Sequence, residues 1–218
     1  MKDKQYIQRN YVADFVADEQ TPGLIRGVPI VKEVFTDIGG AFREIIRSSA
    51  INPNVLKKEI KLFENHNIHG SKAMASSLIP IEKLGGMTFT QDESGITMEA
   101  NLNLKRTDSN DLYLAIQDRS MTGMSFMFSV KRDTWDFTDP DYPTRYIEEI
   151  DDIIEVSVVN FPAYPQTSIG VRSIESSEND LNVLDKARHQ NIINRSAETE
   201  QLELLKFKNK NILIGGRK

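Results

Sequence analysis

The sequence predicts a β-rich α+β fold, with a globular body at residues 1–173 and a C-terminal tail at residues 174–218. Apolar and aromatic runs, separated by turn residues, fill the body and are typical of strands. The composition changes near Ser173, because all eight prolines and nine of the ten phenylalanines lie in the body. The tail has no proline and nearly balanced charge, so we expect it to be helical or partly disordered.

Six runs of the body are predicted to be strands. They span residues 6–16, 25–35, 87–89, 96–104, 124–135 and 146–159. Thr21-Pro22-Gly23 separates the first two runs, and Asp92-Glu93-Ser94-Gly95 is a hairpin turn between the next two. Residues 139–143, with two prolines, form a loop between the last two runs.

Two body segments have helical spacing of their apolar residues. Residues 53–60 begin with a proline, which suits a first helical turn, and residues 111–118 follow Ser109, a residue type that caps helices. Two helices within an antiparallel β body favour a closed barrel or a sandwich with the helices packed outside. In the tail, residues 177–180 fit a capping box at the start of a helix.

Composition excludes several classes of function. The chain of 218 residues has no cysteine, which excludes disulfides, thiol catalysis and cysteine-ligated zinc. Its formal charge of −5 argues against a direct nucleic-acid partner. No apolar run approaches 18 residues and the N-terminus does not resemble a signal peptide, so we expect no membrane contact and action in the compartment of synthesis. We expect no cofactor and no metal site.

His66 and Ser125 are the first two candidates for catalysis. His66 lies in the polar run Phe-Glu-Asn-His, where an imidazole suits a general base at neutral pH. Ser125 lies in the run Gly-Met-Ser-Phe-Met-Phe and is a poor nucleophile unless a base removes its proton. Two interpretations stay open here, because a surface histidine and a strand serine bonded to backbone fit the same patterns.

Glu155 is the third candidate, since a carboxylate within an apolar strand is costly to bury without a partner. It would accept a hydrogen bond from an imidazole N–H and fix its tautomer, or it would face solvent. The carboxylates of residues 148, 149, 151 and 152 fit a solvated loop or strand start.

These motifs, in this order, resemble the prohead proteases of tailed bacteriophages. The run from Glu155 to Pro165 and its continuation through residues 167–173 is similar to the family's closing signature, and residues 41–46 resemble its early strand. The resemblance covers residues 5–173 and implies Ser125 as nucleophile and His66 as general base. We place the third catalytic residue at Glu155.

The resemblance also implies a fold and a task. The fold is similar to that of the herpesvirus assembly proteases, a closed antiparallel barrel with surrounding helices. The task is to trim the scaffolding part of the major capsid protein inside the phage procapsid, in the bacterial host cytoplasm, and to digest itself. The tail would then be a self-cleaved or capsid-docking segment, and a homo-oligomer is an open alternative.

The chain departs from the family pattern after the histidine. Asn67 stands where the family often has an aspartate. The family also often has an arginine shortly after the histidine, where this chain has Lys72, and a lysine ammonium is not geometrically equivalent to a guanidinium. His69 is an alternative third member, ranked below Glu155 because three residues separate it from His66. The main rival function is a non-catalytic capsid assembly protein. A bacterial esterase is disfavoured because the chain has no Gly-x-Ser-x-Gly motif.

Overall fold

The structure, a computed structural model, describes residues 6–12, 16–18, 20–160 and 174–215. The strands are β1 (Tyr6–Val12), β2 (Val16–Ala17), β3 (Leu24–Val31), β4 (Thr36–Asp37), β5 (Arg43–Ile46), β6 (Lys61–Glu64), β7 (Ala75–Ser76), β8 (Gly86–Gln91), β9 (Gly95–Asn101), β10 (Gly123–Asp136) and β11 (Thr144–Val159). The helices are α1 (Thr107–Gln117) and α2 (Ile174–Gly215). The β-rich α+β class is confirmed.

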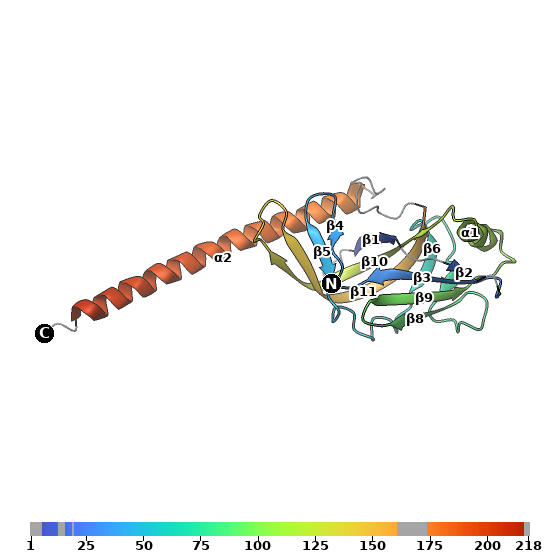
Figure 1. Cartoon of the computed structure of the whole chain (residues 1–218), viewed down its shortest axis with the longest axis horizontal. Coiled ribbons are helices and arrows are strands. Elements are labelled where there is room, and N and C mark those ends of the chain that lie inside the picture. Colours follow the sequence, from blue (N-terminus) through green and yellow to red (C-terminus); the bar gives the residue numbers. More distant parts are fainter. Residues whose placement is uncertain (1–5, 13–15, 19, 161–173, 216–218) are drawn as a thin grey trace. The chain divides into compact units, whose positions relative to one another are not determined.

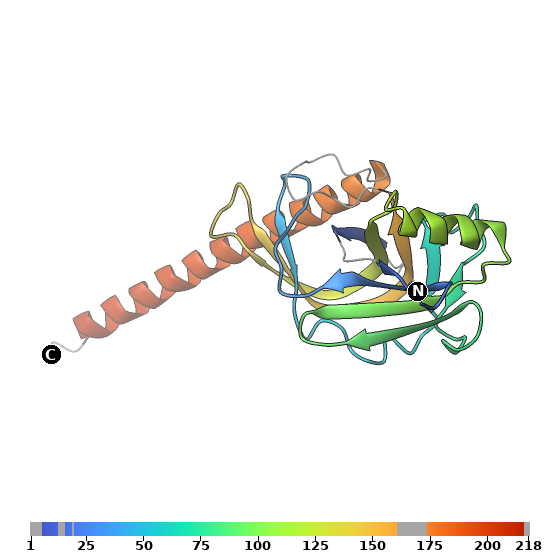
Figure 2. The same ribbon diagram turned by 45° about the vertical axis from the view of Figure 1, so that its right-hand side comes forward.

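The strands form one curled sheet, as Figures 1 and 2 show. Its order is β1-β10-β11-β6-β7-β8-β9-β3-β2, with β5 also on β11 and β4 on β5. The closed barrel is not confirmed, because β1 and β2 end the sheet and no pairing between them is present in the described residues. One of these end strands, β2, has only two residues and offers little edge for closure.

The sheet is mixed, whereas a purely antiparallel one was expected. β5 and β6 both run parallel to β11. They share one partner because β11 is 16 residues long: β5 pairs with residues 144–147 and β6 with residues 155–158. β11 also forms a long antiparallel hairpin with β10 around the predicted loop at residues 139–143.

The predicted strands that correspond to β8, β9, β10 and β11 are confirmed, and their predicted ends differ from the observed ends by three residues or fewer. The hairpin turn between β8 and β9 is held by Asp92, whose carboxylate accepts the Ser94 hydroxyl and the N–H groups of Ser94 and Gly95. These hydrogen bonds, that of the Ser94 hydroxyl first, hold the pKa of Asp92 below its ordinary value. The run at residues 6–16 forms β1 and the start of β2, and residues 13–15 lie outside the described residues.

The predicted helix at residues 111–118 is confirmed as α1, but it starts at Thr107. Ser109 does not cap it, because Ser109 lies inside the helix, buried, with its hydroxyl 3.4 Å from Met74 Sδ. The predicted helix at residues 53–60 is wrong, since the segment forms only turns. The Asn52 side chain accepts the Asn54 N–H at 2.9 Å, a local bond that competes with a helical ladder.

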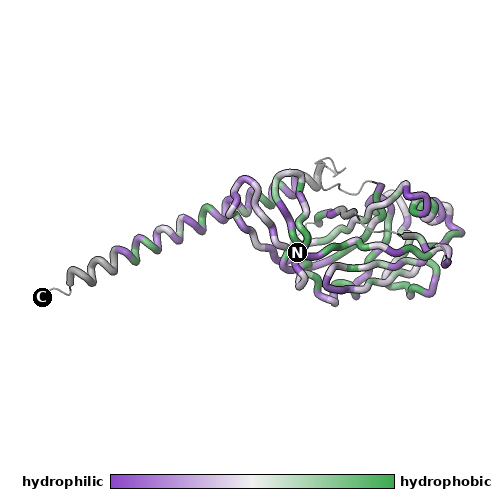
Figure 3. Tube along the Cα trace, in the orientation of Figure 1, coloured by the Kyte–Doolittle hydropathy of each residue, from purple (hydrophilic) through white to green (hydrophobic). Residues whose placement is uncertain are grey.

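The core lies on one face of the curled sheet and is built from aliphatic and aromatic side chains of β3, β6 and β8 to β11, joined by residues of α1. On β10 the buried Met124, Phe126 and Phe128 point to this face. Ser125 alternates with them and therefore points to the other face. Figure 3 shows the apolar positions concentrated along the strands.

A buried ionic cluster joins four strands of the body. The Arg9 guanidinium donates two hydrogen bonds to Glu44, at 2.6 and 2.9 Å, and Arg145 donates to Glu44 at 3.2 Å and to Asp133 at 2.7 Å. Arg9 and Glu44 are each 1% exposed. Two buried guanidinium groups therefore share the Glu44 carboxylate, and Arg145 also has Asp133 for charge compensation.

We expect Glu44→Gln to lower the free energy of unfolding by about 3–5 kcal/mol, because it removes the buried anion that two guanidinium groups share. The measurement is urea denaturation followed by fluorescence. The matched control is Glu99→Gln, which breaks the Arg26–Glu99 pair whose side chains are 67% and 29% exposed, and it should cost less than about 1 kcal/mol. Equal losses in the two variants would contradict the role of the cluster.

The chain divides into two compact units, Met1–Ser177 and Glu178–Lys218. Helix α2 begins at Ile174, so the predicted capping box at residues 177–180 lies inside the helix instead of at its start. In the second unit the exposed apolar residues are scattered among polar ones (Figure 3): Leu181, Ile192, Ile193, Leu202, Leu204 and Leu205. No described helix is long and apolar enough to cross a membrane.

Candidate active site

His66 stands in a sharp turn at the end of β6. Asn65 and His66 both have positive φ, 47° and 58°, which turns the chain back immediately after the strand. Asn65 ties the turn to β11 and to the residue after it: its N–H donates to the Val158 carbonyl at 2.9 Å, and its side-chain oxygen accepts the Asn160 N–H at 3.1 Å. Asparagine tolerates this left-handed conformation better than most residues, which suits it to the position.

His66 and Glu155 are brought together by the parallel pairing of β6 and β11. His66 Nδ1 lies 2.6 Å from Glu155 Oε1, and the side chains are 14% and 1% exposed. His66 Nε2 is buried and has no hydrogen-bond partner among the described residues. A neutral imidazole that donates its Nδ1 proton to the carboxylate presents Nε2 as a proton acceptor. The pair therefore has the orientation that a general base requires.

Ser157 completes this group and was missed by the sequence reasoning. Its hydroxyl donates to Glu155 Oε2 at 2.6 Å and accepts the His66 backbone N–H at 3.1 Å. It thus fixes the carboxylate and the turn that carries the imidazole. The available signal was its position two residues after Glu155, which places both side chains on one face of the strand.

Ser125 lies on the same face as this group, because it is directly opposite Ser157 in the β10–β11 register. The side chain is fully buried. Its hydroxyl donates to the Arg9 carbonyl of β1 at 3.0 Å. The structure thus places Ser125 opposite Ser157, the residue that contacts Glu155 and His66, with its proton on a backbone acceptor instead of on the imidazole.

The other candidates lie apart from this group. His69 is exposed in the turn that follows His66. Lys72 is also exposed, and its charge contributes to a lowered pKa of Asp108, which the hydrogen bond from Arg106 lowers most. Glu149 and Asp152 form ion pairs with Lys131 and Lys58. No group of three or more side chains fit to hold a metal ion is present in the described parts of the chain.

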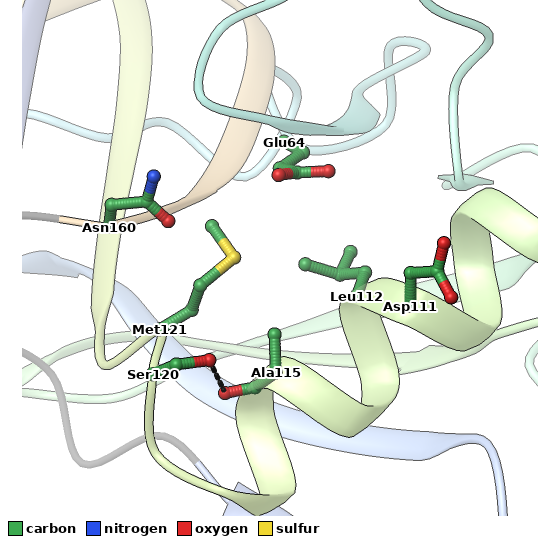
Figure 4. Close-up of a pocket in the computed structure, with 7 residues that line it drawn as sticks. All are labelled: Glu64, Asp111, Leu112, Ala115, Ser120, Met121 and Asn160. Atoms are coloured by element: carbon green, nitrogen blue, oxygen red, sulfur yellow. Dashed lines mark hydrogen bonds between the residues drawn. The ribbon is translucent and has the colours of Figure 1, made fainter.

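A pocket of about 440 Å³ lies where β6 and β11 end and β10 begins, against α1. Figure 4 shows its lining: Glu64, Asp111, Leu112, Ala115, Ser120, Met121 and Asn160. Glu64 immediately precedes the Asn65–His66 turn.

A buried carboxylate that orients an imidazole, with serine hydroxyls on the adjoining strands, is a set of groups that serine hydrolases use. The sequence profile of the caudovirus prohead serine proteases matches residues 13–180. The chain belongs to this family and is a serine protease of phage capsid maturation. No curated protein and no solved structure matches it. The closing signature begins at Glu155, and its part at residues 161–173 lies outside the described residues.

We expect Ser157→Ala to lower kcat/KM by about tenfold to a hundredfold, because both the Glu155 carboxylate and the His66 turn lose a hydrogen bond. Cleavage of the natural substrate protein is the readout, with the unfolding midpoint measured in parallel.

Ser129→Ala is the matched control for this change. Ser129 is a buried serine of β10 whose hydroxyl has no partner among the described residues. Its loss should leave kcat/KM within about twofold, since no hydrogen bond is removed. A Ser157→Ala variant as active as Ser129→Ala would show that the hydroxyl does not position the site.

Proposed function

We propose that the protein is an endopeptidase that trims the scaffolding part of the phage major capsid protein, with Ser125 as nucleophile, His66 as general base and Glu155 as orienting acid. The observation that carries the proposal is the His66–Glu155 pair, in which His66 Nε2 has no hydrogen-bond partner among the described residues. The register of β10 and β11 puts Ser125 opposite Ser157, which belongs to the same group of side chains. Family membership argues against the non-catalytic alternative.

The mechanism begins with a change of hydrogen bond at Ser125. The hydroxyl leaves the Arg9 carbonyl and turns toward His66 Nε2, an exchange that costs at most about 0.5–1.5 kcal/mol because a new hydrogen bond replaces the old one. Oγ then attacks the scissile carbonyl carbon while its proton passes to Nε2. General-base assistance of this kind contributes roughly 10²–10⁴-fold to the rate.

The remaining steps reuse the same groups. The tetrahedral adduct collapses as His66 gives its proton to the leaving amine, which breaks the C–N bond and leaves an ester on Ser125. Water, deprotonated by Nε2, then hydrolyses the ester and restores the serine. Throughout, the Glu155 carboxylate stabilises the imidazolium, and Ser157 holds that carboxylate in place.

A prohead protease acts inside the procapsid. We propose that this one reaches its substrate during assembly in the host cytoplasm and that it also cuts itself, with the tail at residues 174–218 as the removed or capsid-docking segment. The composition change near Ser173 supports this division of the chain.

Co-expression with the phage's capsid protein tests the catalytic assignment. Wild-type protein should shorten the capsid protein by one defined segment in an intact-mass spectrum. Ser125→Ala should reduce the rate of shortening at least about a thousandfold, because the nucleophile is removed. The control Ser129→Ala should trim normally. Trimming by Ser125→Ala at the wild-type rate is the outcome against the assignment.

Self-digestion is tested by the intact mass of the protease itself. We expect the wild-type chain to lose its tail during capsid assembly and the Ser125→Ala chain to keep all 218 residues. A wild-type protease that trims the capsid protein while it stays full length would exclude self-cleavage without affecting the catalytic assignment.

A further inference from the structure

The pocket against α1 has two kinds of wall. Leu112, Ala115 and Met121 form an apolar side, and Leu112 and Met121 are themselves buried. Glu64 and Asp111 supply two carboxylates. In Figure 4 the Leu112 and Met121 side chains point into the space beneath the Glu64 carboxylate, with Asp111 to one side. The combination suits a side chain with an aliphatic stem and a charged or polar end.

The two carboxylates have no counter-ion among the residues that the structure describes. Neither Glu64 nor Asp111 forms an ion pair with any residue that the structure describes, although most other acidic residues near the strands do. Burying an apolar side chain beside them would strip water from unpaired anions, which costs free energy. A cationic end group on the occupant removes that cost and adds charge-assisted hydrogen bonds.

The pocket is tied to the candidate active site by the backbone. Glu64 is two residues before His66, and Met121 is four residues before Ser125. Asn160 follows β11 directly, and its N–H holds Asn65. Glu64 and Ser157 belong to opposite faces, since Phe63 is the residue paired with Ser157. The pocket thus lies at the end of β6, beside the turn that carries His66, and around the strand ends from the catalytic face.

We propose that this pocket binds a lysine or arginine side chain of the polypeptide substrate and so sets cleavage-site preference. The proposal rests on the proposed function, which it extends to a substrate class. The volume of about 440 Å³ accommodates either side chain with its stem along Leu112 and Met121 and its cation between Glu64 and Asp111.

Binding is measured on the full-length Ser125→Ala chain, which keeps the substrate intact. The probes are acetylated and amidated heptapeptides of alanine whose central residue is lysine, norleucine or glutamate. The readout is the chemical shift of the Met121 ε-methyl group, assigned with Met121→Leu. We expect the lysine peptide to shift this signal and to bind about tenfold more tightly than the norleucine peptide, and the difference to shrink at high salt.

Two double variants distinguish binding by the pocket carboxylates from attraction by the overall charge of the protein. Glu64→Gln with Asp111→Asn should abolish the preference for lysine over norleucine. Glu82→Gln with Glu93→Gln removes the same charge from exposed loop residues outside the pocket lining and should preserve the preference. Equal binding of lysine and norleucine peptides, or no shift of Met121 with lysine, overturns the proposal.

Cleavage by the wild-type chain distinguishes the two proposals. With a peptide library, cuts should cluster at one fixed distance from lysine or arginine, and Glu64→Lys with Asp111→Lys should move them toward acidic residues. Cleavage without basic preference overturns the pocket assignment alone. Lysine binding by Ser125→Ala, with no cleavage of the library or the capsid protein by wild type, overturns the proposed function alone.

Discussion

The hydrogen bond between His66 Nδ1 and Glu155 Oε1 is the constraint on which the rest of the site depends. A carboxylate that is 1% exposed needs partners, and Glu155 has two, the imidazole and the Ser157 hydroxyl. Ser157 lies on the same strand, whereas the imidazole is available only because β6 pairs in parallel with the last residues of β11 and then turns sharply. The site is therefore a consequence of one pairing register, and the length of β11 makes that register compatible with the β10 hairpin and with β5.

The N-terminal strand links the stability of the body to the state of Ser125. The Arg9 guanidinium is anchored in the buried cluster around Glu44, while the Arg9 carbonyl accepts the Ser125 hydroxyl. β1 is an end strand of the sheet, so this acceptor lies on a strand that pairs with β10 alone among the described strands. The buried ionic cluster thus keeps β1 in register and holds the Ser125 hydroxyl in a defined conformation on the Arg9 carbonyl.

Local patterns were sufficient to predict the longer strands and the candidate residues, but they did not predict short strands such as β4 and β7 or the long-range pairing. Alternation identified β10 and β11, and the motif order pointed to His66, Ser125 and Glu155. β5 and β6 each pair in parallel with β11, which joins segments about 90 to 100 residues apart in the sequence. Such pairing leaves no periodic signal in the sequence. Residues 53–60 do not form the predicted helix, because the Asn52 side chain accepts the Asn54 N–H and this local hydrogen bond competes with a helical one. The role of Ser157 depends on the backbone N–H of His66, in the turn after β6, which periodicity alone does not reveal.

The most direct test of the account is labelling with a fluorophosphonate, which modifies a serine only when a base activates it. The modified residue is identified by peptide mass in the wild-type, His66→Ala and Glu155→Gln chains. The account predicts label on Ser125 in the wild type, almost none in His66→Ala and a strongly reduced rate in Glu155→Gln. Label on Ser157, or on Ser125 at an unchanged rate without the imidazole, would contradict it.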